Sequence, residues 1–189
     1  MEKKMKDGRQ VYIVSPLIEE SETLNVKSAQ ETYEEYISIF PNRKIGLMHG
    51  RQNYKEKQKV MEQFKNHELD ILVSTTVIEV GVNVPNASIM VIRDAQRFGL
   101  SSLHQLRGRV GRGKYQSYCV LESETTNEIS AKRLKVMEET TDGFKIAEED
   151  LKLRNSGEIL GTRQSGVSDM LFTDFVKNVK EIKLVHDFV

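Results

Sequence analysis

Cysteine and tryptophan are almost absent from this sequence of 189 residues, which has one cysteine and no tryptophan. A single cysteine excludes an internal disulfide framework and a cysteine-based zinc cluster. The four histidines lie far apart and lack the spacing of metal ligands, so we expect no metal site in this chain. Cys119 lies in the apolar run Tyr118–Leu121, and we expect it to be a buried, reduced core residue.

Long hydrophobic runs are absent too. The longest uninterrupted apolar run has four residues, whereas a membrane-spanning helix needs ~20. The first residues, Met1–Gly8, are charged and have no apolar stretch behind them, which is not the pattern of a secretory signal peptide. We therefore expect no membrane partner and a cytoplasmic protein. With 38% apolar and 30% charged residues, the composition is that of one globular domain, or one domain with an appendage.

A net charge is missing as well, because 28 basic and 28 acidic residues cancel. One stretch departs from this balance, since residues 97–114 contain five basic residues and no acidic one. The five are Arg97, Arg107, Arg109, Arg112 and Lys114. Positive charge that is concentrated inside a neutral chain indicates an anionic partner at that place.

The arginines of this stretch alternate with glycines in the order Arg107-Gly-Arg-Val-Gly-Arg112. Guanidinium groups match the oxygens of a phosphate, and glycine allows another backbone or a ligand to come close. Leu103, Leu106 and Val110 recur at helical spacing, which predicts a helix with one buried face, capped by the Ser101-Ser102 pair. The alternative is a solvated basic loop or an RNA-binding Arg-Gly segment, but such tracts are disordered repeats without this periodicity.

Residues 105–112, Gln-Leu-Arg-Gly-Arg-Val-Gly-Arg, resemble motif VI of the superfamily 2 helicases. Read together with residues 97–105, they look like the RecG branch of that superfamily. In the family this motif projects arginine fingers across a cleft onto a triphosphate that the other motor lobe holds. The resemblance therefore implies that Arg109 and Arg112 are the fingers, and that Gln105 senses or orients at the γ-phosphate.

The order of the apolar runs predicts the fold class. Strands are expected at residues 11–14, 44–48, 70–74, 88–92 and 117–121. Helices are expected at residues 28–40 and 53–64, each opened by a capping box, at Ser28 and at Asn53. Continuous apolar strands separated by helices indicate an α/β fold with a parallel sheet covered on both faces. The helicase resemblance implies that this part is a RecA-like lobe.

From about residue 124 the pattern becomes helical. Helices are expected at residues 127–140, 144–154 and 173–188, with a glycine-containing loop at 155–168. We therefore divide the chain into a lobe of residues 1–123 and a helical extension of residues 124–189.

The helical extension carries a second resemblance. Residues 147–166 are similar to the translocation motif shared by RecG and the transcription-repair coupling factor. In that family a helical hairpin and the loop that follows it transmit the ATP-driven movement of the lobes to duplex DNA. The resemblance implies coupling roles for Arg133, Arg154, Arg163 and Gln164.

Polar residues directly follow several predicted strands, where parallel sheets bind their ligands. Residues 74–86 resemble helicase motif V, which implies that Thr75 contacts a nucleic-acid phosphate and that Gly81 and Asn83 lie near the ATP ribose. The family usually has Asp at the position of Asn83. The alternative is that the hydroxyl pair Thr75-Thr76 is only a helix cap.

Residues 46–51 resemble the motif IVa region, which faces the nucleic-acid backbone in the family. This implies that His49 and Gly50 lie on the DNA side. The alternative is a simple strand-to-helix turn that uses the backbone freedom of Gly50.

Two motifs of a complete motor are absent from the sequence. No Gly-x-x-x-x-Gly-Lys-Ser/Thr occurs, and no strand ends in an Asp-Glu pair that could hold magnesium. Phosphoryl transfer in this class requires both. The chain thus resembles the second half of a two-lobe motor, either cut from a longer protein or standing alone. ATP and Mg²⁺ would be bound mainly by an N-terminal motor lobe.

The predicted function is that of the C-terminal motor lobe of a RecG-type ATP-dependent DNA helicase, which remodels branched DNA in repair and recombination. Replication forks and Holliday junctions are the expected substrates. The expected partners are branched double-stranded DNA and the N-terminal motor lobe, and the isolated chain is expected to be inactive.

Two alternatives remain open at this point. The first is the same lobe of a transcription-repair coupling factor, against which residues 15–21 and 161–166 favour RecG. The second is a non-catalytic nucleic-acid-binding module that kept the fold. Arg109 and Arg112 argue against this second alternative, because a protein that only binds has no use for a finger in an ATP cleft.

Overall fold

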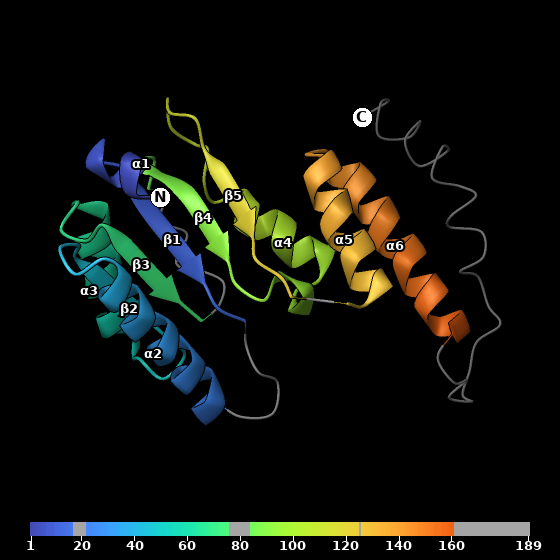
Figure 1. Ribbon diagram of the computed structural model, residues 1–189, viewed down its shortest axis with the longest axis horizontal. Helices are drawn as coiled ribbons and strands as arrows, with labels where there is room; N and C mark the ends of the chain where they lie inside the picture. The colour runs from blue at the N-terminus through green and yellow to red at the C-terminus, as the bar shows by residue number, and fades with distance from the viewer. Residues whose placement is uncertain (17–21, 76–83, 125, 161–189) are drawn as a thin grey trace.

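Five parallel strands form one sheet in the computed structural model of the chain, which describes residues 1–16, 22–75, 84–124 and 126–160 (Figure 1). The strands are β1 (Gln10–Val14), β2 (Ile45–Met48), β3 (Ile71–Ser74), β4 (Ala87–Ile92) and β5 (Tyr118–Leu121). They are ordered β2-β3-β1-β4-β5, and every pairing is parallel. The predicted α/β fold is confirmed, and each strand begins within one residue of its expected start.

The inner strands β1, β3 and β4 are buried along their whole length, as continuous apolar runs predict. β5 lies at one edge of the sheet, and Tyr118 and Val120 on this strand are 46% and 48% exposed. Cys119 is a free cysteine that packs against one of the core clusters but is only partly buried, so the expected full burial is wrong. Burial raises the pKa of its thiol to about 11 although Arg107 acts in the opposite direction, so the thiol is protonated at neutral pH.

Hydrophobic side chains form a separate cluster on each face of the sheet. The helices that cover the two faces are α1 (Glu2–Lys6), α2 (Glu22–Ile39), α3 (Tyr54–Lys65) and α4 (Leu100–Arg107). Met5 of α1 and Tyr36 of α2 pack on one face. Phe64 of α3 and Leu103 of α4 pack on the other. The sheet is thus covered on both faces, as predicted.

One of the two predicted capping boxes is confirmed. Asn53 Oδ1 accepts from Glu56 N at 3.0 Å, and Glu56 Oε2 accepts from Asn53 N at 2.9 Å. The box predicted at Ser28 is wrong, because α2 already begins at Glu22 and Ser28 lies inside the helix. There its carbonyl oxygen accepts from Thr32 Oγ1 at 3.0 Å. No glycine or proline separates Glu22 from Ser28, so nothing stops the helix from starting earlier.

Two long helices follow the sheet, α5 (Glu128–Glu139) and α6 (Gly143–Leu160). We refer to them as the hairpin. The two helices pack against each other and against α4, and Figure 1 shows them beyond α4, on the side away from β2 and β3. The side chain of Asn127 caps α5 by accepting from Ile129 N and Ser130 N. None of the helices in the described ranges is long and apolar enough to cross a bilayer.

The end of the hairpin differs from the prediction. The loop expected at residues 155–168 is wrong over 155–160, which continue α6. Gly157 lies within that helix, where a single glycine costs only ~1 kcal/mol relative to alanine. The helix predicted at 173–188 lies outside the described residues.

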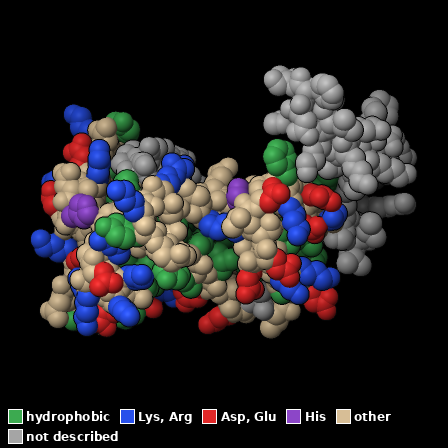
Figure 2. All heavy atoms as spheres, turned by 90° about the horizontal axis from the view of Figure 1, so that it is seen from above, with side chains coloured by type: hydrophobic (Ala, Val, Ile, Leu, Met, Phe, Trp, Pro, Cys, Tyr) green, Lys and Arg blue, Asp and Glu red, His purple; other side chains and the backbone are tan. Residues whose placement is uncertain are grey.

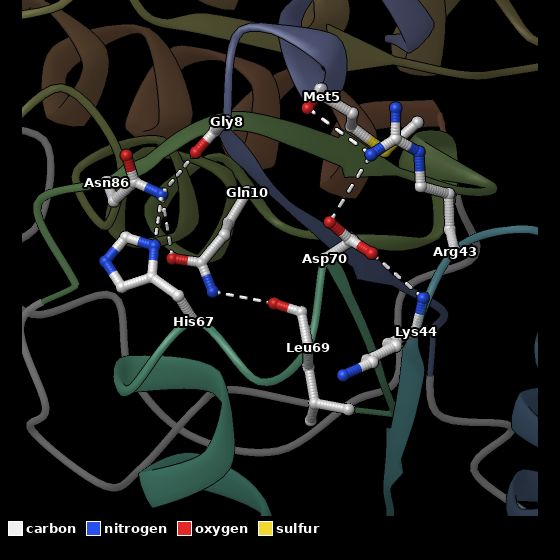
Figure 3. A network of polar contacts seen from close by, with 9 residues as sticks. All are labelled: Met5, Gly8, Gln10, Arg43, Lys44, His67, Leu69, Asp70 and Asn86. Atoms are coloured by element: carbon white, nitrogen blue, oxygen red, sulfur yellow. Dashed lines mark hydrogen bonds and ion pairs between the residues drawn. The ribbon is translucent and has the colours of Figure 1, made fainter.

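Polar contacts join the starts of four strands (Figure 3). They lie at what we call the amino edge of the sheet, which is the end where the parallel strands begin and not one of the two edge strands. Asn86 Nδ2 donates to Gly8 O at 2.8 Å and to Gln10 Oε1 at 3.0 Å. Gln10 Nε2 in turn donates to Leu69 O at 2.7 Å. Asp70 accepts from Lys44 N at 2.9 Å and pairs with Arg43 at 3.6 Å. These contacts hold the beginnings of β1, β2, β3 and β4 in fixed positions relative to one another.

Candidate functional site

The helix α4 carries the motif singled out in the sequence. Its buried face consists of Leu100, Leu103 and Leu106, and Gly99 is its N-cap without a side-chain bond. The predicted cap at Ser101-Ser102 is therefore wrong, because Leu100 joins the apolar face and both serines lie inside the helix. The predicted buried face itself is confirmed, and Val110, 8% exposed, extends it beyond the end of the helix.

α4 ends at Arg107, and a further tight turn continues its direction. Arg109 N donates to Leu106 O at 2.9 Å and Val110 N donates to Arg107 O at 3.3 Å. We call residues 108–117, between α4 and β5, the arginine loop. Arg109 and Arg112 therefore lie on this loop rather than on the helix.

The first arginine of the motif has a structural role. Arg107 Nη1 donates to Met137 O at 2.7 Å and to Thr140 O at 2.8 Å, and its Nη2 contacts His104 Nδ1 at 3.2 Å. The side chain thus joins α4 to the end of α5, so Nη1 of Arg107 is already used by protein carbonyls.

Gln105 and Arg109 differ from Arg107 in their contacts. Neither side chain has a hydrogen-bond or ion-pair partner among the residues that the structure describes. They are four residues apart, so they lie on the same side of the helix and its continuing turn. Arg109 also lies near enough to Tyr12 to lower the pKa of that phenol, although burial raises this pKa more strongly. Such unused donors can stabilise charge on a phosphoryl group.

Arg112 is exposed, and its Nε donates to Gly108 O at 3.0 Å within the loop itself. Close packing explains the two glycines that flank Arg112. A Cβ on Gly113 would lie 2.3 Å from the carbonyl oxygen of Pro85, and one on Gly111, which has φ +86°, would lie 2.7 Å from Ser117 Oγ. The arginine loop is therefore packed against Pro85, just before β4, at the amino edge of the sheet.

On the face shown in Figure 2 the basic residues do not form one patch. Figure 2 shows Lys and Arg side chains scattered among Asp and Glu over one face of the molecule, in keeping with the net charge of zero. Charge alone therefore does not mark the site on this face, and the geometry of the individual arginines distinguishes them.

The predicted DNA-side residues lie at the opposite end of the sheet, where the strands end, which we call the carboxyl edge. His49 and Gly50 follow β2, and Thr75 follows the neighbouring β3, with Thr75 N donating to Met48 O at 3.2 Å. Gly50 is exposed and has no heavy atom within 4 Å of the place a Cβ would take. Thr75 is only 1% exposed, so its hydroxyl offers no accessible contact in this arrangement.

His49 borders a pocket of about 470 Å³ on the side of α3. The residues that line it are His49, Arg51, Gln52, Glu56, Lys59, Val60 and Gln63. His49 N donates to Gln52 Oε1 at 3.0 Å, whereas its buried Nδ1 has no partner in the described part of the chain. Burial lowers the pKa of this imidazole, and the charges of Lys57 and Arg51 lower it further. The neutral ring is thus the favoured form.

The remaining predicted residues belong to the hairpin or fall outside the description. Arg133 on α5 donates through Nη1 to Phe98 O at 3.3 Å, and its buried Nε has no partner in the ranges described. Arg154 lies on α6, but its side chain is outside the described part. Gly81 and Asn83, as well as Arg163 and Gln164, lie outside the described residues altogether.

The sequence analysis missed the junction between α4 and the hairpin. His104 packs against the start of α6, where a Cβ on Gly143 would lie 3.2 Å from its Nε2. Between β5 and α5 lies a pocket of about 690 Å³ that Arg107, Leu121, Leu134 and Met137 help to line. No spacing in the sequence marks these contacts, because they join residues about thirty positions apart.

A parallel five-stranded sheet covered by helices on both faces, with an arginine loop leading into its edge strand, is the fold of a RecA-like helicase C-terminal lobe. Residues 2–114 match the family described as helicase conserved C-terminal domain, and the chain belongs to that family. Residues 140–188 match a second family model, described as ATP-dependent DNA helicase RecG, domain 3, C-terminal.

Relatives and solved structures agree with this assignment. The ATP-dependent DNA helicase RecG of Staphylococcus epidermidis is 50% identical over 188 residues, which cover 99% of this chain and 28% of the relative. RecG of Aquifex aeolicus is 59% identical over 170 residues, which cover 88% of this chain and 21% of the relative. The chain thus spans about a quarter of the length of these relatives.

A structure of RecG bound to a three-way DNA junction matches with a TM-score of 0.71 and 46% identity, over 96% of this chain and 23% of that one. The C-terminal domain of the DEAD-box protein Dbp5 matches with a TM-score of 0.54 and 15% identity, over 82% of this chain and 88% of that one. This second likeness concerns the fold alone.

Proposed function

We propose that this chain is the C-terminal motor lobe of a RecG-type ATP-dependent DNA helicase that remodels branched DNA during repair and recombination in the cytoplasm. The observation that carries the proposal is the arginine loop, where Arg109 and the neighbouring Gln105 present polar groups that no described residue uses. Its support comes from relatives that are named ATP-dependent DNA helicases and from a relative solved on a three-way DNA junction. The same matches favour RecG over a transcription-repair coupling factor.

ATP would lie between this lobe and the N-terminal motor lobe of the same protein. Arg109 and Arg112 would bind its phosphate oxygens, Gln105 would orient at the γ-phosphate, and Gly81 and Asn83 would be the residues near the ribose. Donors that are held in position before charge develops lower the barrier to phosphoryl transfer.

Magnesium belongs to the other lobe in this proposal. Within the described residues no three His, Cys, Asp or Glu side chains are grouped as metal ligands. In this proposal the contribution of this lobe to the reaction is made by guanidinium and amide groups. The ion supplies charge neutralisation at the phosphates where it is bound.

Branched double-stranded DNA would contact the carboxyl edge of the sheet. Gly50 leaves its backbone open to a phosphate, and His49 and the basic side chains near it border the adjoining pocket. Thr75 lies beside them on the neighbouring strand, and its hydroxyl becomes available only if the chain around it moves. The ATP and DNA surfaces thus lie at opposite edges of one sheet.

The hairpin would transmit movement between these surfaces, with Arg133, Arg154, Arg163 and Gln164 as the coupling residues. The contacts of Arg107 support this role, because they bond the end of α4 directly to the end of α5. A change in the position of the arginine loop is thereby mechanically linked to the hairpin.

The proposal is tested in a two-lobe protein in which this chain replaces the matching 28% of Staphylococcus epidermidis RecG. ATP hydrolysis and unwinding of a three-way junction are measured with and without the double substitution Arg109→Ala/Arg112→Ala. The expected result is junction-stimulated hydrolysis that the double substitution abolishes. Arg97→Ala, an exposed arginine of the same basic stretch, serves as the matched control and should leave the rate unchanged. Equal rates in all three proteins would refute the proposed function.

A further inference from the structure

The arginine loop is supported by a ring that the sequence does not connect with it. The guanidinium carbon of Arg9, which lies just before β1, is 3.6 Å from the centroid of the Tyr115 ring. Tyr115 lies three residues beyond Arg112 on the same loop. The ring is nevertheless 54% exposed, so its contact with Arg9 is a surface contact and not part of either hydrophobic core.

Arg9 is itself held rigidly. Its Nη1 donates to Asn86 Oδ1 at 2.6 Å, and its Nε and Nη2 donate to Asp7 O at 3.2 and 3.1 Å. A guanidinium fixed on three of its nitrogens forms a planar surface of defined orientation, and a ring stacked on it is held in one place.

The two supports of the loop are joined through one residue. Gly113 packs on the carbonyl of Pro85, and Asn86 is the next residue along the chain. Asn86 accepts from Arg9 and donates to Gly8 O and Gln10 Oε1, as Figure 3 shows for the last two. Arg9 and Pro85 therefore keep a fixed distance from each other, and so do Tyr115 and Gly113, which rest on them.

Arg112 lies between Gly111, at positive φ, and Gly113, so its own backbone provides little stiffness. We propose that Tyr115, stacked on Arg9, is a positioning residue that holds the arginine loop in its working geometry. This role deepens the proposed function and rests on it, because the loop acts on ATP only if Arg109 and Arg112 are fingers. An arginine finger displaced by about 1 Å loses much of its effect on the transition state.

The first test uses the 189-residue chain and does not involve ATP. The amides of Arg109 and Val110 join the loop to the end of α4 by donating to Leu106 O and Arg107 O, so their hydrogen exchange reports how well the start of the loop is ordered. Loss of one exposed cation–π contact changes a local opening equilibrium by roughly 2- to 5-fold. Tyr115→Ala should accelerate exchange of these amides by that factor, whereas Tyr115→Phe, which keeps the ring, should not.

Tyr118→Ala is the matched control, because Tyr118 is similarly exposed at the same edge and its ring lies 5.5 Å from Lys4 Nζ, outside the arginine loop. It should leave exchange at Arg109 and Val110 unchanged. Unchanged exchange in Tyr115→Ala, or equal acceleration in Tyr118→Ala, would overturn the proposal.

The second test measures ATP hydrolysis in the two-lobe protein. Tyr115→Ala should lower kcat by roughly 10-fold with KM for ATP preserved, since positioning acts in the transition state, and Tyr115→Phe should restore kcat. Faster exchange without a change in kcat would also overturn the positioning role. If the unsubstituted two-lobe protein hydrolyses ATP without needing Arg109, the proposed function fails, and so does a positioning role in hydrolysis. In that case, faster hydrogen exchange in Tyr115→Ala shows only that the contact between Tyr115 and Arg9 orders the loop.

Discussion

The guanidinium of Arg107 donates to the carbonyl oxygen of Thr140 at 2.8 Å and so joins α4 to the turn between α5 and α6. The same nitrogen donates to Met137 O at 2.7 Å. Carbonyls in the last turn of a helix have no partner within it, and a cation there is favourable for the helix dipole as well. One side chain therefore caps α5 and also fixes the hairpin against the helix that leads into the arginine loop.

Arg107→Ala should destabilise the chain. Hydrogen bonds from a charged group contribute about 1.5–3 kcal/mol, and each kcal/mol corresponds to roughly 2–4 °C in Tm for a chain of this size. A decrease of several degrees in Tm is expected by calorimetry, and Arg107→Lys should recover part of it because a cation remains. An unchanged Tm in Arg107→Ala would mean that these two bonds contribute nothing.

Arg109→Ala and Arg112→Ala, unlike Arg107→Ala, should change activity and leave stability nearly unchanged. Neither guanidinium bonds to another element in the described residues, so Tm should change by less than about 1 °C. In the two-lobe protein each substitution should lower ATP turnover by ~10³-fold, the effect of an arginine finger, with little change in DNA affinity. Either variant hydrolysing ATP at the normal rate would show that its arginine is not a finger.

The three arginines mark where sequence-based prediction stops. Strands and the buried face of α4 could be predicted, because apolar runs and helical spacing depend on neighbours a few residues away. Arg107 could not be distinguished from Arg109 and Arg112, since all three share the same alternation with glycine. Its carbonyl partners lie 30 and 33 residues further along the chain, on a different helix.

Local signals also failed where several of them competed. Ser28 and the Ser101-Ser102 pair are good N-caps by residue type, yet both lie inside helices. The helix extends past a candidate cap when the preceding residues can also be helical and an apolar one among them, such as Leu100, can be buried. The box at Asn53 is correct because Asn53 follows the exposed turn after β2, where no earlier start is available.

Gly113→Ala should show how closely the arginine loop is packed. A Cβ at this position would lie 2.3 Å from the carbonyl oxygen of Pro85, and backbone atoms cannot turn away as a side chain can. Overpacking of this kind costs about 1–3 kcal/mol, measurable by urea unfolding. Gly50→Ala, where a Cβ meets nothing within 4 Å, is the control and should stay within about 0.5 kcal/mol. Equal unfolding free energies for the two variants would contradict the packing described here.

His49 should make stability depend on pH. Burial, together with Lys57 and Arg51, lowers the pKa of its imidazole in the folded state. The unfolded chain then binds the proton more readily, so stability is full above the unfolded pKa of about 6.5 and is lost as the pH falls below it. The decrease in Tm between pH 7.5 and 5.5 should be smaller in His49→Gln than in the unsubstituted chain. An identical decrease in the two proteins would exclude His49 as the cause.

The last prediction separates coupling from stability in the helical extension. Arg133 is a proposed coupling residue that also contacts Phe98 O from α5, so Arg133→Ala removes a packing contact as well and should lower Tm, ATP turnover and unwinding together. Gln164 belongs to the predicted translocation loop, and Gln164→Ala should leave Tm and DNA-dependent ATP turnover nearly unchanged while unwinding of a three-way junction collapses. Such a difference is expected only if the loop transmits movement that ATP and DNA both bias, rather than holding the hairpin in place. All three quantities are measured on the same preparation of the two-lobe protein. A parallel loss of Tm, ATP turnover and unwinding in Gln164→Ala would give Gln164 the structural role expected of Arg133, and the coupling assignment would be wrong.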